Sequence, residues 1–348
     1  MRPPRSEGDE ILRTNKHIEI VTAANPGLSS MGKTSRTAIR AVLARHYRDV
    51  RITIINDIDD LEQLAARQPD LVFLGMKYLP FGTDKLWISD YLDRQGIAYT
   101  GSGQAAHHLE LNKSRAKQRA LEAGLRTAKF YVVRQGEQAA PEDHQLEFPV
   151  FIKPANRGGG QGVDSQSLAY TQQALRAKVE SIRERLGADS LVEEYLPGRE
   201  FSVAILRDGE SSGYSAMPIE LVAPPDQNGD RLLSAAVKSA DAESFMAITE
   251  PRLKQRVNEL ALDVFRALGA RDYGRIDIRL DRQGSPHFLE ANLIPSLISG
   301  YGSFPKACLL NSGLSHEAML LSIVGLAMGR GEATITDRPP ILMPALAV

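Results

Sequence analysis

Three oxygen-bearing side chains lie close together in the C-terminal third of the chain. Asp277 lies in RIDIRLD, and Glu290 and Asn292 lie in HFLEANLIP. Side chains two residues apart in a strand share a face, so pairing across a turn at 282–284 would bring all three together. Carboxylate and amide oxygens suit Mg2+, which keeps water and phosphate oxygens as its other ligands. The alternative is a surface hairpin with solvated acids, and the apolar neighbours of Glu290 argue against it.

Two lysines could contact phosphate. Lys153 ends the apolar run VFIK and is followed by a glycine-rich segment, and Lys113 lies at the expected start of a helix in LELNKSRAKQRA. Glycines let backbone N–H groups approach phosphate oxygens, while lysine supplies a positive charge. A glycine cluster alone indicates only a flexible turn, and Lys113 alone only a surface lysine. The order strand, lysine, glycine loop favours a phosphate site.

A third element is the segment LVEEYLPGREF. Glu193 ends one expected strand and Glu200 begins the next, with a turn between them. Carboxylates at such a turn can accept hydrogen bonds from an adenine amino group or a ribose hydroxyl. The alternative is a hairpin whose acids are solvated.

The segment NPGLSSMGKTS has the spacing of a P-loop, with Gly27 followed after four residues by Gly32, Lys33 and Thr34. This spacing predicts a kinase or small NTPase that binds phosphates at residues 27–34. Such an enzyme also needs a strand that ends in an Mg2+-linked aspartate, and DLVFLGMKYL contains none there. The hypothesis of a P-loop enzyme stays open as the second interpretation.

The composition is that of a globular protein. The 348 residues carry a formal net charge of −1 with a pI of about 6.7, so no overall basic field would recruit nucleic acid or anionic lipid. Cys308 is the only cysteine, which excludes an intrachain disulfide, and we interpret it as a core residue. No apolar run approaches the ~20 residues that cross a bilayer. With no secretory signal at its N-terminus, the chain is expected in the cytoplasm, without a membrane or nucleic-acid partner.

Strands and helices alternate in the first part of the chain, which predicts a parallel sheet covered by helices. We expect strands at 17–23, 50–56, 70–76 and 97–102, and helices at 35–47, 57–68 and 84–96. The second part mixes long helices with paired strands. There we expect helices at 114–124, 171–187 and 251–270, strands at 128–133 and 149–155, and pairs of strands at 190–206 and 273–295.

In this order and spacing, these elements resemble the ATP-grasp superfamily and, within it, the D-alanine–D-alanine ligase branch. The resemblance runs from about residue 18 to residue 326. It is strongest over NKSRAK, FIKPANRGGGQGV, VEEYLPGREFSVAIL and GRIDIRLDRQGSPHFLEANLIPSL. It implies three α/β domains, with ATP held between the second and third, and a homodimer.

The expected fold class is therefore α/β, with α+β character in the ATP-binding part. The expected ranges are a loose arm at 1–17, a parallel-sheet pre-ATP-grasp substrate domain at 18–104, a central ATP-grasp subdomain with the glycine-rich loop at 105–190, a C-terminal subdomain with the Mg2+ site at 191–330, and a tail at 331–348.

The resemblance assigns ATP to matching positions. Its phosphates would contact Lys113, Lys153 and the loop 157–163, which contains Gly158, Gly159, Gly160 and Gly162. Its adenine and ribose would contact Glu193, the backbone of Tyr195 and Leu196, and Glu200.

The resemblance also assigns the metal and the catalytic residues. Asp277, Glu290 and Asn292 would bind two Mg2+ ions, and Arg275 would steady the acyl phosphate. Lys238 matches a lysine that contacts the γ-phosphate from a mobile loop. The implied reaction joins two small molecules. The carboxylate of one attacks the γ-phosphate of ATP, and the amine of the other then attacks the acyl phosphate to form an amide.

The chain departs from the ligase pattern where the first substrate would bind. The loop AANPGLSSMGKTS contains no acid in place of the usual glutamate, and KYLPFGTDKL keeps Gly82 and Asp84 but not the histidine and glutamate of that motif. Gly159 replaces a serine, and Ser296, counted among the catalytic candidates, replaces a glycine. Substrates other than two D-alanines are therefore expected. The candidate contacts are Ser30, Lys33, Lys77 and Asp84.

Three further alternatives stay open: a cyclo-ligase that closes an amide within one molecule, an imine-forming ligase, and a relic fold that binds nucleotide without catalysis. Retention of Asp277, Glu290 and Asn292 together argues against the relic, which would have no use for a metal.

Overall fold

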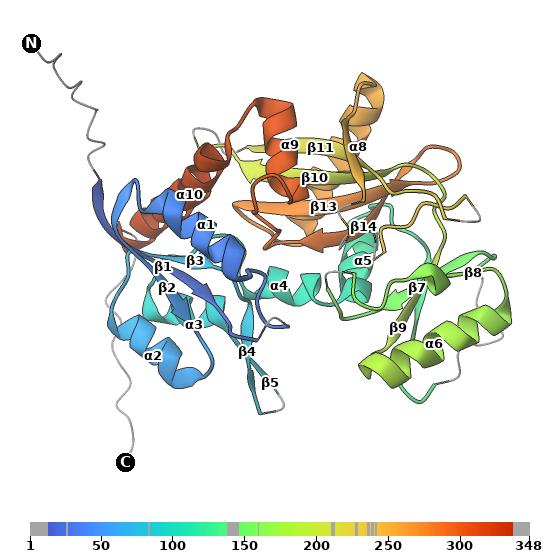
Figure 1. Ribbon diagram of the computed structural model, residues 1–348, viewed down its shortest axis with the longest axis horizontal. Coiled ribbons are helices and arrows are strands. Elements are labelled where there is room, and N and C mark those ends of the chain that lie inside the picture. The colour runs from blue at the N-terminus through green and yellow to red at the C-terminus, as the bar shows by residue number, and fades with distance from the viewer. Residues whose placement is uncertain are drawn as a thin grey trace, which may run out of the picture. The chain divides into compact units, whose positions relative to one another are not determined.

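The computed structural model describes residues 13–336, except for 26, 83, 138–145, 159, 210–212, 227–228, 235–236, 238–239 and 241 (Figure 1). Gly159, Lys238, most of the expected arm and the end of the expected tail lie outside the described residues. The chain forms two compact units. Unit 1 comprises Met1–Gly101 and Glu317–Val348, and unit 2 comprises Ser102–His316.

Unit 1 is built on a parallel sheet, as the alternating pattern predicts. Strands β1 (Thr14–Thr22), β2 (Tyr47–Ile54) and β3 (Leu71–Leu74) pair in the order β2-β1-β3. Strand β1 begins inside the range 1–17 that the sequence predicts to be loose. The unit also contains α1 (Lys33–Leu43), α2 (Ile58–Ala66), α3 (Ile88–Gln95) and almost all of α10 (His316–Thr336).

Three predicted elements of unit 1 are wrong in extent. The helix predicted over 84–96 begins only at Ile88, because residues 84–87 form strand β5 (Asp84–Trp87) of a hairpin with β4 (Tyr78–Phe81). Gly82 permits this turn with a φ of 59°. The strand predicted over 97–102 forms only an isolated bridge to β3. Helix α1 ends at Leu43, since β2 already begins four residues later.

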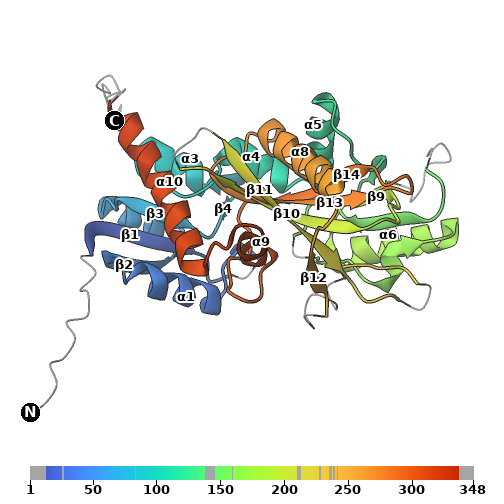
Figure 2. The ribbon, with the colours of Figure 1, turned by 90° about the horizontal axis from the view of Figure 1, so that it is seen from above.

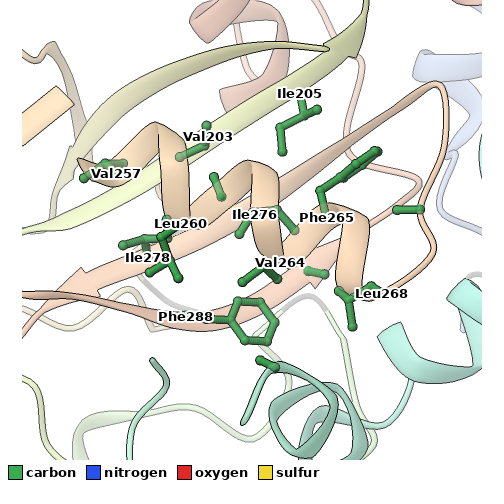
Figure 3. Packing of buried hydrophobic residues seen from close by; sticks show 14 of the residues in the cluster. Val203, Ile205, Val257, Leu260, Val264, Phe265, Leu268, Ile276, Ile278 and Phe288 are labelled. Atoms are coloured by element: carbon green, nitrogen blue, oxygen red, sulfur yellow. The ribbon is translucent and has the colours of Figure 1, made fainter. Parts of the chain in front are cut away.

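Unit 2 contains an antiparallel sheet with an apolar face and a polar face. Its strands are β10 (Glu200–Arg207), β11 (Tyr214–Val222), β12 (Ser244–Ala247), β13 (Tyr273–Leu280) and β14 (Pro286–Asn292), in the order β12-β11-β10-β13-β14. Helix α8 (Pro251–Ala267) packs on the apolar face, where Ile276 and Ile278 lie against Val264 and its neighbours (Figure 3). Helix α9 (Ser303–Ser312) lies on the opposite side (Figure 2). Alternation along β13 therefore points Arg275 and Asp277 away from α8.

A second antiparallel sheet of unit 2 has the order β6-β9-β7-β8 and packs on helix α6 (Gln172–Leu186). Its strands are β6 (Phe130–Val133), β7 (Val150–Pro154), β8 (Leu168–Ala169) and β9 (Ser190–Glu194). Strands β9 and β10 are consecutive but belong to different sheets, so LVEEYLPGREF connects two sheets and does not form the hairpin of the alternative interpretation. The remaining elements are α4 (Gln104–Glu110), α5 (Lys113–Glu122) and a 3-10 turn at Ser165–Ser167.

The two sheets of unit 2 are joined beside strand β14. Thr127 forms a parallel bridge with Phe288, and its hydroxyl donates a hydrogen bond to the Phe288 carbonyl oxygen at 2.7 Å. In the part of the chain that the structure describes, no single helix has the length and apolar character needed to span a membrane.

Candidate active site

Strands β13 and β14 bring the predicted metal ligands onto one face. Asp277 pairs directly with Glu290, and Arg275 pairs with Asn292. A register shift after Asp277 pairs Ile278 with Phe288, although simple alternation would place Phe288 and Glu290 on the same face. This bulge lets Phe288 enter the core against α8 while Glu290 faces the polar side. Because of the bulge, one short strand contributes both an acid to the cluster and an aromatic ring to the apolar core.

Asp277 is the centre of the cluster. The Arg275 guanidinium donates to both of its carboxylate oxygens at 2.9 Å, and Ser202 Oγ on β10 donates at 3.0 Å. Asn292 Nδ2 lies 3.3 Å from the same carboxylate. Burial alone would lower the pKa of Arg275, but the charge of Asp277, its hydrogen bonds to Arg275 and the charges of Glu290 and Glu110 together hold that pKa above its ordinary value. Arg275 is thus a fixed positive charge at this face.

The donor set fits Mg2+. The described residues include no group of three His, Cys, Asp or Glu side chains placed to hold a metal. A cation here would therefore combine the two carboxylates with the amide oxygen of Asn292, which a half-turn of the amide presents in place of Nδ2. Mg2+ commonly binds through one or two carboxylates and takes its other ligands from water and phosphate. Asp277, Glu290 and Asn292 supply that combination.

A lysine near the end of β7 is held by a buried acid. Lys153 Nζ lies 2.7 Å from Glu193 Oε2, and Lys117 Nζ lies 2.6 Å from Glu193 Oε1. Burial would raise the pKa of Glu193, but the charges of Lys117 and Lys153 outweigh it and hold that pKa below its ordinary value. Burial would likewise lower the pKa of Lys153, and the charges of Glu193 and Glu290 raise it above its ordinary value. Burial is the largest influence on Lys117 and lowers its pKa, although the charge of Glu193 acts in the opposite direction. Glu193 is therefore a carboxylate in contact with two lysines, of which Lys153 has the raised pKa.

The glycine-rich loop lies beside Lys113. The Lys113 ammonium donates to the Arg157 carbonyl oxygen at the start of the loop and lies 3.9 Å from Glu290 Oε2. Gly162 has a φ of 76°, and a Cβ there would lie 2.6 Å from Pro154 Cγ, so only glycine fits. The structure thus brings Lys113, the described part of the loop and the acid cluster together.

Glu200 and Tyr195, the candidates for nucleotide contact after β9, share one arginine. Arg279 Nη1 lies 3.0 Å from Glu200 Oε2, and Arg279 Nη2 donates to Tyr195 Oη at 3.3 Å. Burial raises the pKa of Tyr195 to about 12. Leu196 is buried next to this pair. The connection between the two sheets is therefore ordered by Arg279, which lies on the polar face of β13.

Helix α9 begins beside Arg275. Its first residue, Ser303, has its Oγ 3.4 Å from Arg275 Nη1 and 3.2 Å from Ser202 Oγ. The preceding Gly302 packs so closely on Ser296 that a Cβ would lie 2.5 Å from the Ser296 carbonyl oxygen. The catalytic candidate Ser296 thus lies next to the N-terminus of α9, whose first residue contacts the partly buried guanidinium of Arg275. A helix N-terminus and a guanidinium both attract anions.

The four substrate candidates lie in unit 1. Ser30 donates its backbone N–H to the Gly75 carbonyl oxygen at 2.8 Å, so the loop before α1 lies against the segment that leads to Lys77. Lys33 is the first residue of α1, and Asp84 begins β5, with both side chains exposed. The structure brings Ser30 and the Lys77 segment together, whereas Asp84 lies on the adjacent hairpin.

Sequence reasoning missed three side chains of unit 2. Lys117 follows Lys113 by one helical turn in NKSRAK, and that i, i+4 spacing was the available signal. Ser202 shares a strand face with Glu200, which could have indicated it. Ser303 reaches the site only because α9 starts there, and no local pattern of residues indicates this.

Solved structures show the fold class. The chain resembles the D-alanine–D-alanine ligase from Bacillus anthracis in complex with ATP, with a TM-score of 0.70 and 20% identity over 92% of this chain and 99% of that chain. The corresponding enzyme from Coxiella burnetii gives a TM-score of 0.67 with 16% identity. The fold is therefore ATP-grasp, as the resemblance in the sequence implies.

Sequence comparisons show the family. The profile described as D-ala D-ala ligase C-terminus matches residues 120–325. The D-alanine–D-alanine ligase of Geotalea uraniireducens (strain Rf4) is 30% identical over 301 residues, which are 85% of this chain and 90% of that protein. The ligase of Cupriavidus metallidurans is 29% identical over 78% of this chain and 79% of that protein. The chain belongs to the D-alanine–D-alanine ligase family, whose members are ATP-dependent ligases that form C–N bonds.

Proposed function

We propose that the protein is an ATP-dependent carboxylate–amine ligase that forms an amide through an acyl phosphate, with substrates other than two D-alanines. The observation that carries the proposal is the cluster of Asp277, Glu290, Asn292 and Arg275 on one face of the β13–β14 pair. Lys113 lies near that cluster and contacts the glycine-rich loop. Lys113, Arg275 and a cation held by the acids would bring positive charge to the phosphates of ATP.

The chemistry needs that charge, because a carboxylate and a triphosphate repel each other. Lys113 and Lys153 would neutralise the phosphates, and Asp277, Glu290 and Asn292 would hold Mg2+, which supplies charge neutralisation to the phosphate oxygens. Arg275 is already oriented by its two bonds to Asp277 and would stabilise negative charge on the acyl phosphate and on the tetrahedral intermediate. No covalent bond to the protein is required.

The P-loop interpretation is not favoured. Membership of the family supports nucleotide binding in unit 2, since the matched range 120–325 lies largely there, whereas Lys33 and Thr34 lie in unit 1. We infer that the loop before α1 contacts a substrate. Its lack of an acid supports a first substrate whose recognition differs from that of D-alanine.

A phosphate-release screen tests the proposal. Purified protein with ATP and Mg2+ is offered pairs of amino acids and amines, with each substrate alone as control, and the product masses are measured. We expect release that requires both partners and is faster for some pair than for D-alanine with D-alanine. Product mass separates an intermolecular amide from a cyclised product or an imine. Fastest turnover with two D-alanines would contradict the proposed substrate difference, and no release with any pair would contradict the ligase.

A further inference from the structure

Lys117 is a buried lysine to which the proposed reaction gives no role. Its side chain is 0% exposed, on helix α5. The ammonium lies 2.6 Å from Glu193 Oε1, and it donates to Thr127 Oγ1 at 2.7 Å and to the Phe288 carbonyl oxygen at 3.3 Å. The hydroxyl and the carbonyl accept two of the three N–H donors of the lysine, and Glu193 Oε1 is an ion-pair partner without hydrogen-bond geometry. A lysine with no exposed surface, held by these three partners, cannot itself reach a phosphate.

Glu193 sits between two lysines that differ in their access to solvent. The side chain of Lys153 is 8% exposed and lies in β7, the strand that leads into the glycine-rich loop, whereas Lys117 has no exposed surface. If Lys153 alone neutralised Glu193, moving its ammonium toward a phosphate would leave a buried carboxylate without a partner, which is strongly unfavourable. Lys117 removes that obstacle, because it remains paired with Glu193 when Lys153 moves.

We propose that Lys117 is a positioning residue that sets nucleotide specificity: it keeps Glu193 as a carboxylate oriented toward the adenine amino group and frees Lys153 for the phosphates. The inference rests on the proposed function, since it takes Glu193 as the acceptor for the base. Lys117 acts through Glu193 and does not contact the nucleotide.

Specificity follows from the chemistry of the carboxylate. An ionised carboxylate only accepts hydrogen bonds, so it matches the 6-amino group of adenine and opposes the 6-carbonyl group of hypoxanthine. Without Lys117, Glu193 loses one of the two charges that hold its pKa down, and a protonated Glu193 can donate to a carbonyl. Removing Lys117 should therefore weaken ATP binding and at the same time reduce the preference for ATP over ITP.

The test compares two buried lysines of unit 2. Lys117→Met removes the ammonium and keeps most of the side-chain volume. Lys178→Met is the matched control, because Lys178 is 2% exposed and its ion-pair partner is Asp164, with Nζ 2.6 Å from Oδ1. The Kd values of ATP and ITP with Mg2+ are measured by calorimetry, with thermal unfolding of each variant. We expect Lys117→Met to raise the Kd of ATP by about tenfold, or about 1.4 kcal/mol, with little change for ITP. Lys178→Met should change neither the Kd of ATP nor the Kd of ITP.

A double-mutant cycle shows whether Lys117 acts through Glu193. In a Glu193→Gln background, Lys117→Met should have little further effect on the Kd of ATP. If the effects of the two substitutions on the Kd of ATP were additive, the proposal would be overturned. It would also be overturned if Lys117→Met lowered the melting temperature but left the ratio of the Kd values of ATP and ITP as in the wild type. If Lys117→Met does not fold, the same measurements are made on Lys117→Gln, which keeps a hydrogen-bond donor and removes the charge. The same results would support or overturn the proposal. A wild-type protein that does not bind ATP would instead refute the proposed function.

Discussion

Replacing Asp277 with asparagine should lower kcat/KM by about 10³-fold, because Mg2+ contributes several kcal/mol of charge stabilisation in such reactions. The substitution removes one of the two carboxylates that would hold the ion and takes the bidentate partner from Arg275. The rate of phosphate release is measured across a range of Mg2+ concentrations. We expect the variant to require more Mg2+ and to remain slow at saturation.

A matched control separates the loss of the ligand from a general effect of removing an acid. Asp263 lies on α8, exposed and paired with Arg266 at 3.1 Å, so Asp263→Asn should leave the rate within about twofold, as expected of a surface ion pair. Circular dichroism confirms that both variants are folded. An Asp277→Asn enzyme with activity close to that of Asp263→Asn would show that the metal does not bind at β13 and β14.

Replacing Lys153 with methionine should raise the Kd of ATP by about 30-fold or more, since truncating one partner of a buried charge pair costs at least about 2 kcal/mol. The expected effect exceeds that of Lys117→Met because Lys153 would contact the phosphates directly. Lys33→Ala, in the segment with P-loop spacing, should leave the Kd of ATP unchanged. Binding is measured by calorimetry with Mg2+ and a nonhydrolysable ATP analogue.

The opposite pattern would favour the P-loop interpretation. If Lys33→Ala abolished binding and Lys153→Met retained it, the nucleotide would bind in unit 1, and the role assigned to the glycine-rich loop would be wrong. If both variants lost ATP affinity equally, each lysine would contribute to ATP binding, which would contradict the proposal of a single nucleotide site.

Much of the fold could be predicted because its patterns are local. The alternation of apolar runs and amphipathic helices was sufficient for the parallel sheet of unit 1, and the two halves of RIDIRLDRQGSPHFLEANL were sufficient for the β13–β14 pair. The hairpin at 78–87 was missed because Leu86, Trp87 and Ile88 fit a helical face as well as a strand. Short apolar runs do not distinguish the two.

The sequence indicated the acids and lysines that the structure brings together in unit 2, but not how they pair with one another. That Asp277 lies opposite Glu290 follows from the turn at 282–284, but the bulge that turns Phe288 into the core depends on packing against α8. Glu193 was assigned to adenine from a resemblance, and only the structure shows it between Lys117 and Lys153. Contacts between residues distant in sequence depend on tertiary packing, which local patterns do not encode.

The central claim is that a divalent cation, held by Asp277, Glu290 and Asn292, meets the phosphates of ATP in unit 2. Anomalous diffraction from crystals grown with Mn2+ and a nonhydrolysable ATP analogue locates the ion directly. We predict Mn2+ within about 2.2 Å of these oxygen atoms, in line with the short metal–oxygen distances of Mg2+ sites, with the triphosphate next to Lys113 and Lys153. Anomalous density beside Thr34, with none at β13 and β14, would contradict the account.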